Sequence, residues 1–396
     1  MRCLWLTWVD PAPEHDGQKI YSGQLIRSIG DAGAEVHVLC AANERSHRRD
    51  GEREGRVTWH LVQHAFPPAW TSIASTLPHV AHRSSSTAMQ RRLSAALEGH
   101  DWDCVVFDGL NSGWALDAVG RAMRGGRRRP RLVYLSHNHE ESMRTSIAAS
   151  ADGSPLRNAL LRRDARKAGG LERRMIDASD LVTAITPEDA ERFQTRAGDK
   201  PVIVMPPGYQ GRRLAERRIT DAIPRRAIIV GSFEWIAKQM NLQDFLTAAD
   251  PIFAAAGAEL EIVGSGDPKF FESLRPGLTA TRLVGRVEAI TPHMDASRIA
   301  VVAERLGGGF KLKVLDYVFN RLPIAALEGS VAGTPLTPDV SMLTFADHRP
   351  LAKGVLAALD DLNLLNRLHT RAYQACSERF DWSDRGRQLA ASIGAP

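Results

Sequence analysis

The sequence predicts an α/β protein made of two doubly wound, Rossmann-like domains that face a cleft. Its 396 residues are too many for one ordinary core and suit two domains of roughly 150–200 residues each. Short, almost wholly apolar runs alternate with helical segments along both halves, a pattern typical of parallel strands covered on both faces. A stretch rich in Pro, Gly and Arg at 206–226 has no apolar period and indicates a linker.

The N-terminal half begins with MRCLWLTWV (1–9), which predicts a strand. The segment 18–33 predicts a helix that Gly33 closes, and EVHVLC (35–40) predicts the next strand. Further strands are predicted by VTWHLVQ, DCVVFD, RLVYLS, DLVTAIT and VIVMP. The C-terminal half repeats the pattern with RRAIIVGSF, AELEIVGSG, TRLVGRV, RIAVVAE and LPIAAL. Ligands of such domain pairs bind at the carboxyl ends of the strands, and therefore in the cleft.

Composition excludes several classes of protein. The four cysteines have no metal-like spacing and mostly lie in or beside strand-like runs, so we expect buried, reduced thiols in a cytoplasmic protein. No run of ~18 apolar residues predicts a membrane span, and the N-terminus does not resemble a signal peptide. The thirteen histidines form no HExxH-type pattern, so we expect neither a metal nor another cofactor.

The net charge of +5 is concentrated in two basic runs at 121–131 and 157–167. Such runs are most often solvated faces, and the alternatives are a nucleic acid or an anionic lipid surface. No aromatic residues interleave these arginines, so we do not expect nucleic acid as a partner.

The segment ERLGGGFKLKVLDYV (304–318) carries the strongest functional signal. A strand precedes it, and three glycines form a turn at the start of a helix, where backbone N–H groups and the helix dipole favour a phosphate. At ~100° per residue, one helix face presents Gly309, Lys313, Asp316 and Asn320. Lys313 suits a diphosphate and Asp316 suits sugar hydroxyls. The alternative is a flexible turn followed by an ordinary ion pair.

The run ERLGGGFKLKVLDYVFNRLPIAAL resembles the C-terminal domain of family 4 glycosyltransferases and their relatives, in which a Gly-Gly-Gly-Thr-Arg-Leu-Lys-Val-Leu-Glu run precedes a small apolar strand. Other segments resemble this family in the family's own order: DGQKIYSGQLIRSIGDAGAEVHVL, SHNHEESMR, DASDLVTAITPEDAERF, GSFEWIAKQMNLQDFL, ELEIVGSG, LVGRVEAI and DWSDRGRQL. The resemblance implies the two-domain GT-B architecture. An N-terminal acceptor-binding domain would span 1–210, a C-terminal helix at 382–396 would cross back onto it, and a nucleotide-sugar-binding domain would span 211–381.

The implied activity is transfer of a sugar from a UDP- or GDP-type donor to a hydroxyl acceptor, with retention of configuration and without a metal. The acceptor would be a glycan, a lipid-linked intermediate or a small natural product. By resemblance, the donor-binding residues of the C-terminal domain are Lys238, Gly264, Val287, Gly307, Gly308, Gly309, Phe310, Lys313 and Asp316. Asp316 stands where the family has a ribose-binding glutamate, and Gly308 stands where its more widespread form has a second glutamate. Glu304 is a secondary candidate.

In the N-terminal domain, His137 ends the strand RLVYLS and matches a family histidine that lies near the donor sugar. Asp108 ends DCVVFD and is a candidate acceptor-side carboxylate or base, with a helix cap as the alternative. Gly17 opens a helix and would admit the diphosphate, and Lys19 suits the same role. Glu140 is a secondary candidate.

The acceptor side is less specified. Trp70, Ile73 and Leu77 predict an apolar acceptor loop, and the basic segment 157–174 predicts a peripheral contact with the anionic inner face of a membrane. Two other functions stay open: a nucleotide-sugar epimerase with the same two-domain fold, and a non-catalytic transferase-like binding subunit. The second alternative draws on Ser232, which occupies the place of an arginine common in the family.

Overall fold

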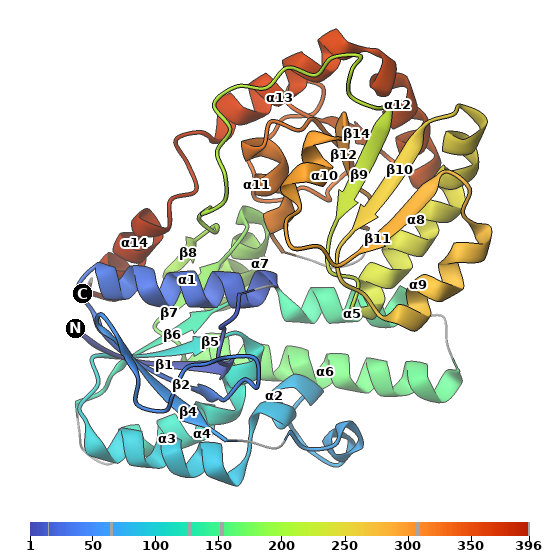
Figure 1. Cartoon of the computed structure of the whole chain (residues 1–396). Coiled ribbons are helices and arrows are strands. Elements are labelled where there is room, and N and C mark those ends of the chain that lie inside the picture. The colour runs from blue at the N-terminus through green and yellow to red at the C-terminus, as the bar shows by residue number, and fades with distance from the viewer. Residues whose placement is uncertain (15, 64–65, 125–127, 151–153, 306–308, 395–396) are drawn as a thin grey trace. The chain divides into compact units, whose positions relative to one another are not determined.

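The computed structural model describes residues 1–14, 16–63, 66–124, 128–150, 154–305 and 309–394. The chain forms two compact units, Met1–Gly208 with Asp381–Pro396, and Tyr209–Phe380. Each unit is built on one sheet flanked by helices (Figure 1).

The first unit contains an eight-stranded sheet with the order β3-β4-β2-β1-β5-β6-β7-β8, in which all neighbours are parallel except β3 and β4. The strands are β1 (Arg2–Val9), β2 (Glu35–Ala41), β3 (Arg53–Glu54), β4 (Val57–Val62), β5 (Cys104–Asp108), β6 (Arg131–Leu135), β7 (Leu181–Ala184) and β8 (Val202–Val204). The strand order reverses between β1 and β5. The loops that leave these two strands diverge, which leaves room for a ligand at their carboxyl ends.

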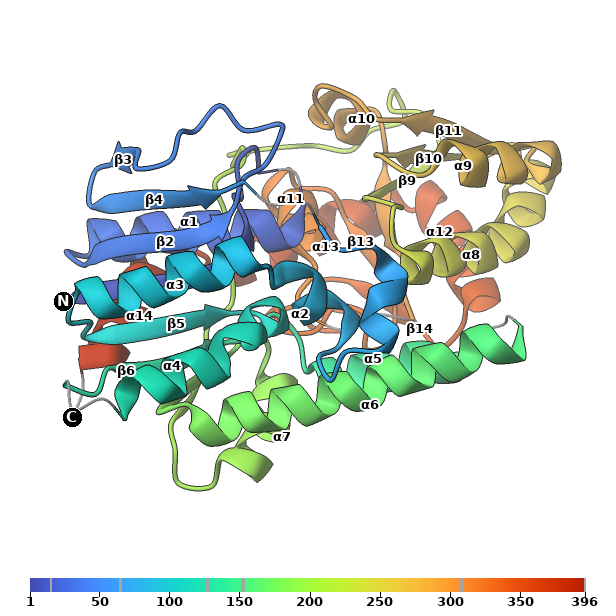
Figure 2. The same cartoon turned by 90° about the horizontal axis from the view of Figure 1, so that it is seen from below.

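The helices of the first unit are α1 (Gly17–Asp31), α2 (His79–Ser84), α3 (Thr87–Gly99), α4 (Leu116–Met123), α5 (Glu140–Ser150), α6 (Pro155–Ala178), α7 (Pro187–Ala197) and α14 (Trp382–Gly394), with short 3₁₀ helices η1 (Ala69–Ile73) and η2 (Leu110–Ala115). Helices α3 and α4 lie along one face of the sheet, and α5 runs beside the long α6 (Figure 2). The C-terminal helix α14 packs on α1 so closely that a Cβ at Gly386 would overlap the Ser28 carbonyl oxygen.

The second unit contains a six-stranded parallel sheet with the order β11-β10-β9-β12-β13-β14. Its strands are β9 (Arg226–Val230), β10 (Glu259–Val263), β11 (Thr281–Gly285), β12 (Ile299–Val302), β13 (Ile324–Leu327) and β14 (Leu343–Phe345). Its helices are α8 (Ile236–Ala255), α9 (Pro268–Leu274), α10 (Thr291–Asp295), α11 (Leu312–Phe319), α12 (His348–Asp360) and α13 (Leu362–Cys376), with η3 (Arg275–Gly277). Here the order reverses between β9 and β12.

Both sheets confirm the predicted α/β class. Their central strands are apolar because both faces are covered, and residues 205–225 form neither helix nor strand. The sequence missed β3 and β14, which have two and three residues and no alternation long enough to detect. All four cysteines are buried free thiols. None of the described helices has the length and hydrophobicity that a membrane span requires.

Candidate active site

A cluster of cationic side chains lies at the reversal point of the second sheet. Glu304 follows β12, and its Oε1 accepts a hydrogen bond from Lys313 Nζ of α11. The other carboxylate oxygen lies 3.8 Å from Lys311 Nζ. Lys238 enters from the first turn of α8, after β9, and its charge also acts on this carboxylate. The cluster therefore joins the loops after the two strands between which the order reverses.

The cluster is partly shielded from solvent, since the side chains of Glu304, Lys311 and Lys313 are each less than one fifth exposed. Burial opposes ionisation of Glu304, but the charges of Lys313 and Lys311 prevail and lower its pKa to about 2. Burial lowers the pKa of Lys311, and the neighbouring lysine charges act in the same direction. A region with an excess of cations that already disfavours further positive charge suits a bound anion.

Lys311 is a residue that the sequence reasoning missed. It is the N-terminal cap residue of α11, two positions before Lys313, and helical spacing alone does not place the two on one face. Its extended backbone turns its side chain back to Glu304. The signal in the sequence was the match of Lys311 to the arginine in the Gly-Gly-Gly-Thr-Arg-Leu-Lys pattern.

Asp316 lies one turn after Lys313 on α11, where Tyr209 is its hydrogen-bond partner. Burial raises the pKa of Asp316 to about 6, although the bond from Tyr209 acts in the opposite direction. A carboxylate at this position can accept two hydrogen bonds from neighbouring hydroxyl groups, which suits the ribose role expected from the sequence.

Replacement of Asp316 with Asn is expected to change stability and nucleotide affinity in opposite directions. The folded-state pKa is raised, so this group's contribution to stability is complete below its unfolded pKa of about 3.9 and is lost as pH rises through about 6. At pH 7.5 the variant should therefore be more stable than the wild type by up to ~3 kcal/mol. It should also bind UDP and uridine more weakly, because one of two acceptor oxygens becomes a donor.

Thermal unfolding at pH 7.5 and 4.5, with titration calorimetry of both ligands, tests this prediction. The stability difference should fall to about a third of its value at the lower pH, because pH 4.5 lies only slightly above the unfolded pKa. A variant that is less stable at both pH values would show that the Asp316 charge does not carry a desolvation cost.

The other donor-site candidates of the second unit are glycines in loops and apolar side chains that pack on the core. Gly264 follows β10 at φ 139°, and a Cβ there would overlap the Gly231 carbonyl oxygen, so only glycine allows these two loops to meet. Val287 packs on the apolar core beside α11, and the Phe310 ring contacts the Phe380 ring at a tilt of 53°, with centroids 5.7 Å apart. The Phe310 side chain therefore supports the loop, and only its backbone remains a ligand candidate. Gly309 has φ 76°, and Gly307 and Gly308 lie outside the described residues.

The first unit has its own cluster at the carboxyl ends of β5 and β6. His137 Nε2 lies 2.6 Å from Asp108 Oδ1. The other Asp108 oxygen accepts a 2.9 Å hydrogen bond from Trp5 Nε1, and Ser22 Oγ of α1 donates to Oδ1 at 3.1 Å. Asp108 is completely buried by these contacts. It can orient the His137 ring. The sequence suggested Asp108 as an acceptor-side carboxylate or base, but this side chain has no exposed surface with which to contact an acceptor.

The His137 ring is also held from its other sides. Tyr21 contacts it edge-on with centroids 5.4 Å apart, and the Tyr21 hydroxyl donates to the Met205 carbonyl oxygen at 2.8 Å. A Cβ at Gly109, whose φ is 75°, would lie 2.9 Å from His137 Cδ2. Because Nε2 is engaged by Asp108, Nδ1 is the ring nitrogen left to face a ligand.

The start of α1 lies next to this histidine. Gly17 is the exposed first residue of the helix, and Asp16 caps it by accepting from the Lys19 N–H at 3.0 Å. Lys19 Nζ lies 3.8 Å from the Asp16 carboxylate, and the Gln18 amide faces Gly109. The structure therefore brings Gly17, Lys19, Asp108 and His137 to one edge of the first sheet.

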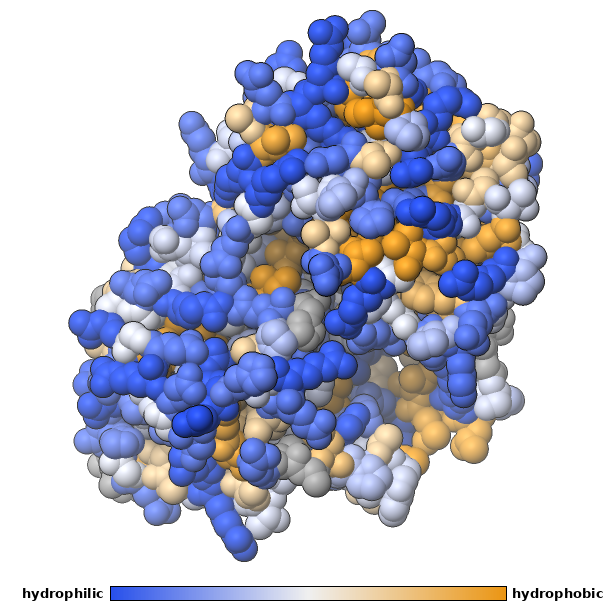
Figure 3. Space-filling view, in the orientation of Figure 1, coloured by the Kyte–Doolittle hydropathy of each residue, from blue (hydrophilic) through white to orange (hydrophobic). Residues whose placement is uncertain are grey.

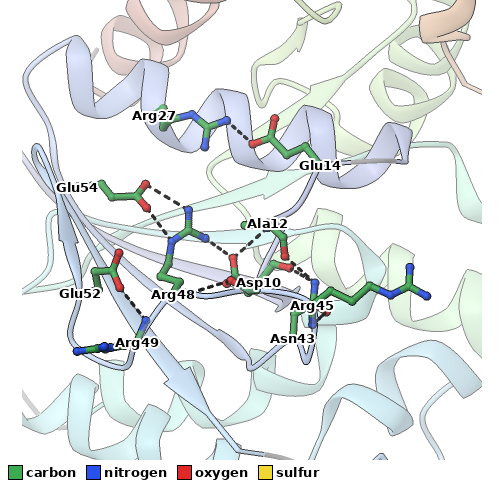
Figure 4. A network of polar contacts seen from close by, with 11 residues as sticks. Asp10, Ala12, Glu14, Arg27, Asn43, Arg45, Arg48, Arg49, Glu52 and Glu54 are labelled. Carbon is green, nitrogen blue, oxygen red and sulfur yellow. Dashed lines mark hydrogen bonds and ion pairs between the residues drawn. The ribbon is translucent and has the colours of Figure 1, made fainter. Parts of the chain in front are cut away.

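A polar network fixes the loop that leads into α1 (Figure 4). Asp10, buried at the end of β1, accepts hydrogen bonds from the Ala12 N–H at 3.0 Å and from Arg48. Arg48 also pairs with Glu54 at 2.9 Å and stacks 3.8 Å above the Trp59 ring. Glu14 in the same loop binds Arg27 of α1. The sequence reasoning missed this network. The signal that could have indicated it is Asp10, a carboxylate directly after the first strand.

Glu140 has a structural environment. It begins α5, and its Oε2 accepts from Arg144 Nε at 2.6 Å. The Glu172 carboxylate of α6 accepts hydrogen bonds from the N–H groups of Glu140 and Glu141, both at 2.9 Å. Burial raises the pKa of Glu172 to about 7. The described contacts of Glu140 thus fix the start of α5 and do not include His137. Among the described residues, no group of three or more His, Cys, Asp or Glu side chains has a metal-binding arrangement.

Family models match both halves of the chain. The glycosyl transferase 4-like domain matches residues 16–208, and glycosyl transferases group 1 matches residues 224–361. No curated protein matches the sequence. Sucrose-phosphate synthase from Thermosynechococcus elongatus has a similar structure, with 17% identity, a TM-score of 0.72 and coverage of 98% of this chain and 97% of that chain.

Two further solved structures are similar over their whole length. WaaG, a glycosyltransferase involved in lipopolysaccharide biosynthesis, is 15% identical with a TM-score of 0.67, and the match covers 100% of both chains. HepE from Anabaena, solved in complex with UDP-glucose, is 15% identical with a TM-score of 0.64, and the match covers 99% of both chains. At these identities the likeness shows the GT-B fold. Because a glycosyl transferase 4-like domain is followed by a domain of the glycosyl transferases group 1, the chain belongs to the GT-B glycosyltransferases and is an enzyme of that class.

Proposed function

We propose that this enzyme transfers a sugar from a UDP- or GDP-type donor to a hydroxyl acceptor, with retention of configuration and without a metal. The observation that carries the proposal is the group of three lysines around Glu304, where the order of the second sheet reverses. The diphosphate leaves with growing negative charge, and preorganised cations in a partly dry site stabilise that charge. Asp316, one helical turn further on, would receive the ribose.

The donor base is proposed from chemistry and from one relative. Asp316 and the lysines would recognise ribose and phosphate, which UDP, GDP and ADP share. HepE, which has the same fold, was solved with UDP-glucose, so UDP is the first nucleotide to test.

The proposed reaction is attack on the same face that the leaving group vacates. The bond from the sugar C1 to the diphosphate oxygen breaks, the acceptor oxygen bonds to C1, and the acceptor proton passes to the departing diphosphate oxygen. His137 stabilises charge near the reacting sugar, and Asp108 holds its ring through Nε2. Asp108 is buried and accepts hydrogen bonds with both oxygens, which does not suit a nucleophile for double displacement.

A nucleotide panel tests the donor assignment. UDP, GDP, ADP and dTDP, tested at one common concentration, should include one that raises Tm, and a nucleotide present at 100 times its Kd adds ~2.7 kcal/mol of stability. The matching nucleotide sugar should then be consumed when acceptor hydroxyls are supplied. If all four diphosphates leave Tm unchanged, the donor site is wrongly assigned.

We further propose that this enzyme works in the cytoplasm at an anionic membrane surface, through a stripe on α6 and the neighbouring η1. Leu156, Leu160, Arg163 and Lys167 follow the i, i+4, i+7, i+11 spacing of one helix face, on which Leu156 is 72% exposed. Lys167 Nζ donates to the Ser72 carbonyl oxygen at 2.8 Å and so fixes η1, which carries the exposed Trp70 and Ile73. Hydrophobic residues are visible where α6 begins (Figure 3).

The charges beside these apolar side chains favour a lipid surface over a solvated face. Exposed arginines flank the stripe at 157, 162 and 166, and Arg163 within the stripe is also exposed. Each basic residue near an anionic bilayer adds ~1 kcal/mol. A lipid-linked acceptor would reach such an enzyme at the membrane. The predicted apolar loop around Trp70 would then insert into the lipid interface.

Replacement of both Trp70 and Leu156 with Ser is expected to weaken binding to vesicles of equal phosphatidylglycerol and phosphatidylcholine at least ~10-fold, because two apolar contacts are lost. Co-sedimentation measures this. The matched control is Val340→Ser, which removes another exposed apolar side chain in the second unit and should bind like the wild type. Equal binding by all three proteins, or no binding by the wild type, would contradict the proposal.

A further inference from the structure

Glu304 is an acidic side chain in a place that should bind an anion. A carboxylate beside a diphosphate repels it, so its presence among Lys238, Lys311 and Lys313 needs a reason. Among the described residues, the charges that act most strongly on Glu304 are those of these three lysines, from α8, the cap of α11 and α11 itself. Without Glu304 the cluster would carry three positive charges, and with it the cluster carries two.

The position of Glu304 is fixed by the surrounding structure. The Ala303 carbonyl oxygen accepts from His348 Nε2 at 3.2 Å, and the Arg305 N–H donates to Asn241 Oδ1 at 2.9 Å. The Arg305 guanidinium donates to Asp347 Oδ1 at 2.7 Å and to the Ala346 carbonyl oxygen at 2.9 Å. The residues on either side of Glu304 are thus held by α8, by α12 and by the turn before α12. The carboxylate is placed against the lysines by tertiary contacts.

The two ligands of a sugar transfer differ in charge at this point. A nucleotide sugar has one negative charge on each phosphate, whereas the free nucleoside diphosphate gains a second charge on its distal phosphate with a pKa of about 6. A cluster with a net charge of two matches the donor. The more highly charged product is then bound less tightly than three unopposed lysines would bind it.

We propose that Glu304 is a charge-matching residue of the donor site, which holds Lys311 and Lys313 in place and favours release of the nucleoside diphosphate over retention. The proposal rests on the proposed function, because it assigns the lysine cluster to the donor diphosphate. Glu304 acts through the lysines and is a positioning residue. The family resemblance gives this position no role.

The test compares UDP with UDP-glucose, or the corresponding pair for another base that the nucleotide panel selects. In Glu304→Gln, which keeps an acceptor oxygen for Lys313, UDP should bind about 10-fold more tightly at pH 8 and UDP-glucose about 3-fold, since the distal phosphate carries two charges in one and one in the other. At pH 5 both gains should be about 3-fold, because the distal phosphate of UDP is then protonated. Glu304→Asp should keep the wild-type ratio of affinities.

The matched control is Glu259→Gln. Glu259 pairs with Arg226 at the amino-terminal ends of β10 and β9, whereas the lysine cluster lies at the carboxyl end of the same sheet. This variant therefore removes the same charge far from the cluster. It should leave both affinities within about 2-fold, because a distant, exposed charge is screened. Titration calorimetry gives the affinities, and thermal unfolding checks that each variant folds.

The outcomes separate the inference from the function on which it rests. If Glu304→Gln changes both affinities equally at pH 8, or weakens UDP, Glu304 only supports the lysines and the charge-matching role is wrong. If the folded wild type binds neither a nucleoside diphosphate nor its sugar, the donor site and the inference both fail. If the ratio shifts at pH 8 and returns at pH 5, the inference stands.

Discussion

Lys313→Ala is expected to lower kcat/KM for the nucleotide sugar by about 10²–10³. Lys313 Nζ donates directly to Glu304, is about nine-tenths shielded from solvent and lies at the start of α11, where the helix dipole adds to its charge. Removal takes away a cation that neutralises the leaving diphosphate and leaves Glu304 with less compensation. Both effects repel the donor.

The comparison of ligands tells a phosphate contact from general damage. UDP binding should weaken about 100-fold, whereas uridine, which lacks phosphates, should bind within about 2-fold of the wild type. Calorimetry with both ligands gives this directly. Lys353→Ala removes an exposed lysine of α12 in the same unit and should change neither affinity. Equal losses for UDP and uridine in Lys313→Ala would refute a specific diphosphate role.

His137→Ala is expected to lower kcat by about 10²–10³ and to leave the Kd of UDP within about 3-fold. Asp108, at 2.6 Å, and Tyr21 hold the ring, and Gly109 leaves the space that the ring occupies. Nδ1, the remaining ring nitrogen, therefore has a fixed position before a ligand binds. Such placement serves the reacting group and not the binding of the nucleotide, which the lysines of the second unit provide in our proposal.

Steady-state kinetics and calorimetry measure the two quantities separately. His100→Ala is the matched control. His100 is an exposed histidine that lies before the start of β5, at the other end of this strand from Asp108, and its replacement should leave kcat unchanged. A His137→Ala enzyme with normal kcat and weakened UDP binding would show that His137 is a donor ligand and not a group that acts on the reacting sugar.

Much of the fold could be predicted because its signals are local. Buried parallel strands such as β5 and β12 have apolar side chains on both faces, which makes them continuous apolar runs that stand out in the sequence. The order of the strands could not be predicted from those runs. The register between β1 and β5 depends on contacts between residues about one hundred positions apart, for which the sequence alone gives no distance.

The candidate site divides in the same way. The glycine-rich run before α11 indicated phosphate chemistry, and the structure adds Lys311 and the lysine charges around Glu304. Phe310 and Glu140 were chosen by position along the chain, but their side chains contact Phe380 and Arg144. Asp108 was chosen because it ends a strand, and only the contacts with Trp5, Ser22 and His137 reveal that it is buried.

The sequence by itself determined the α/β class, the family and the glycine-rich segment at which a diphosphate is proposed to bind, because periodicity and short motifs are local properties. The tertiary structure alone decided which charges meet. In the sequence, Glu304 is recognisable only as a residue at the end of a predicted strand. In the structure, α11 packs against the end of β12 and brings two lysines to the Glu304 carboxylate. Charge interactions depend on distance and burial, and both are set by packing between distant segments.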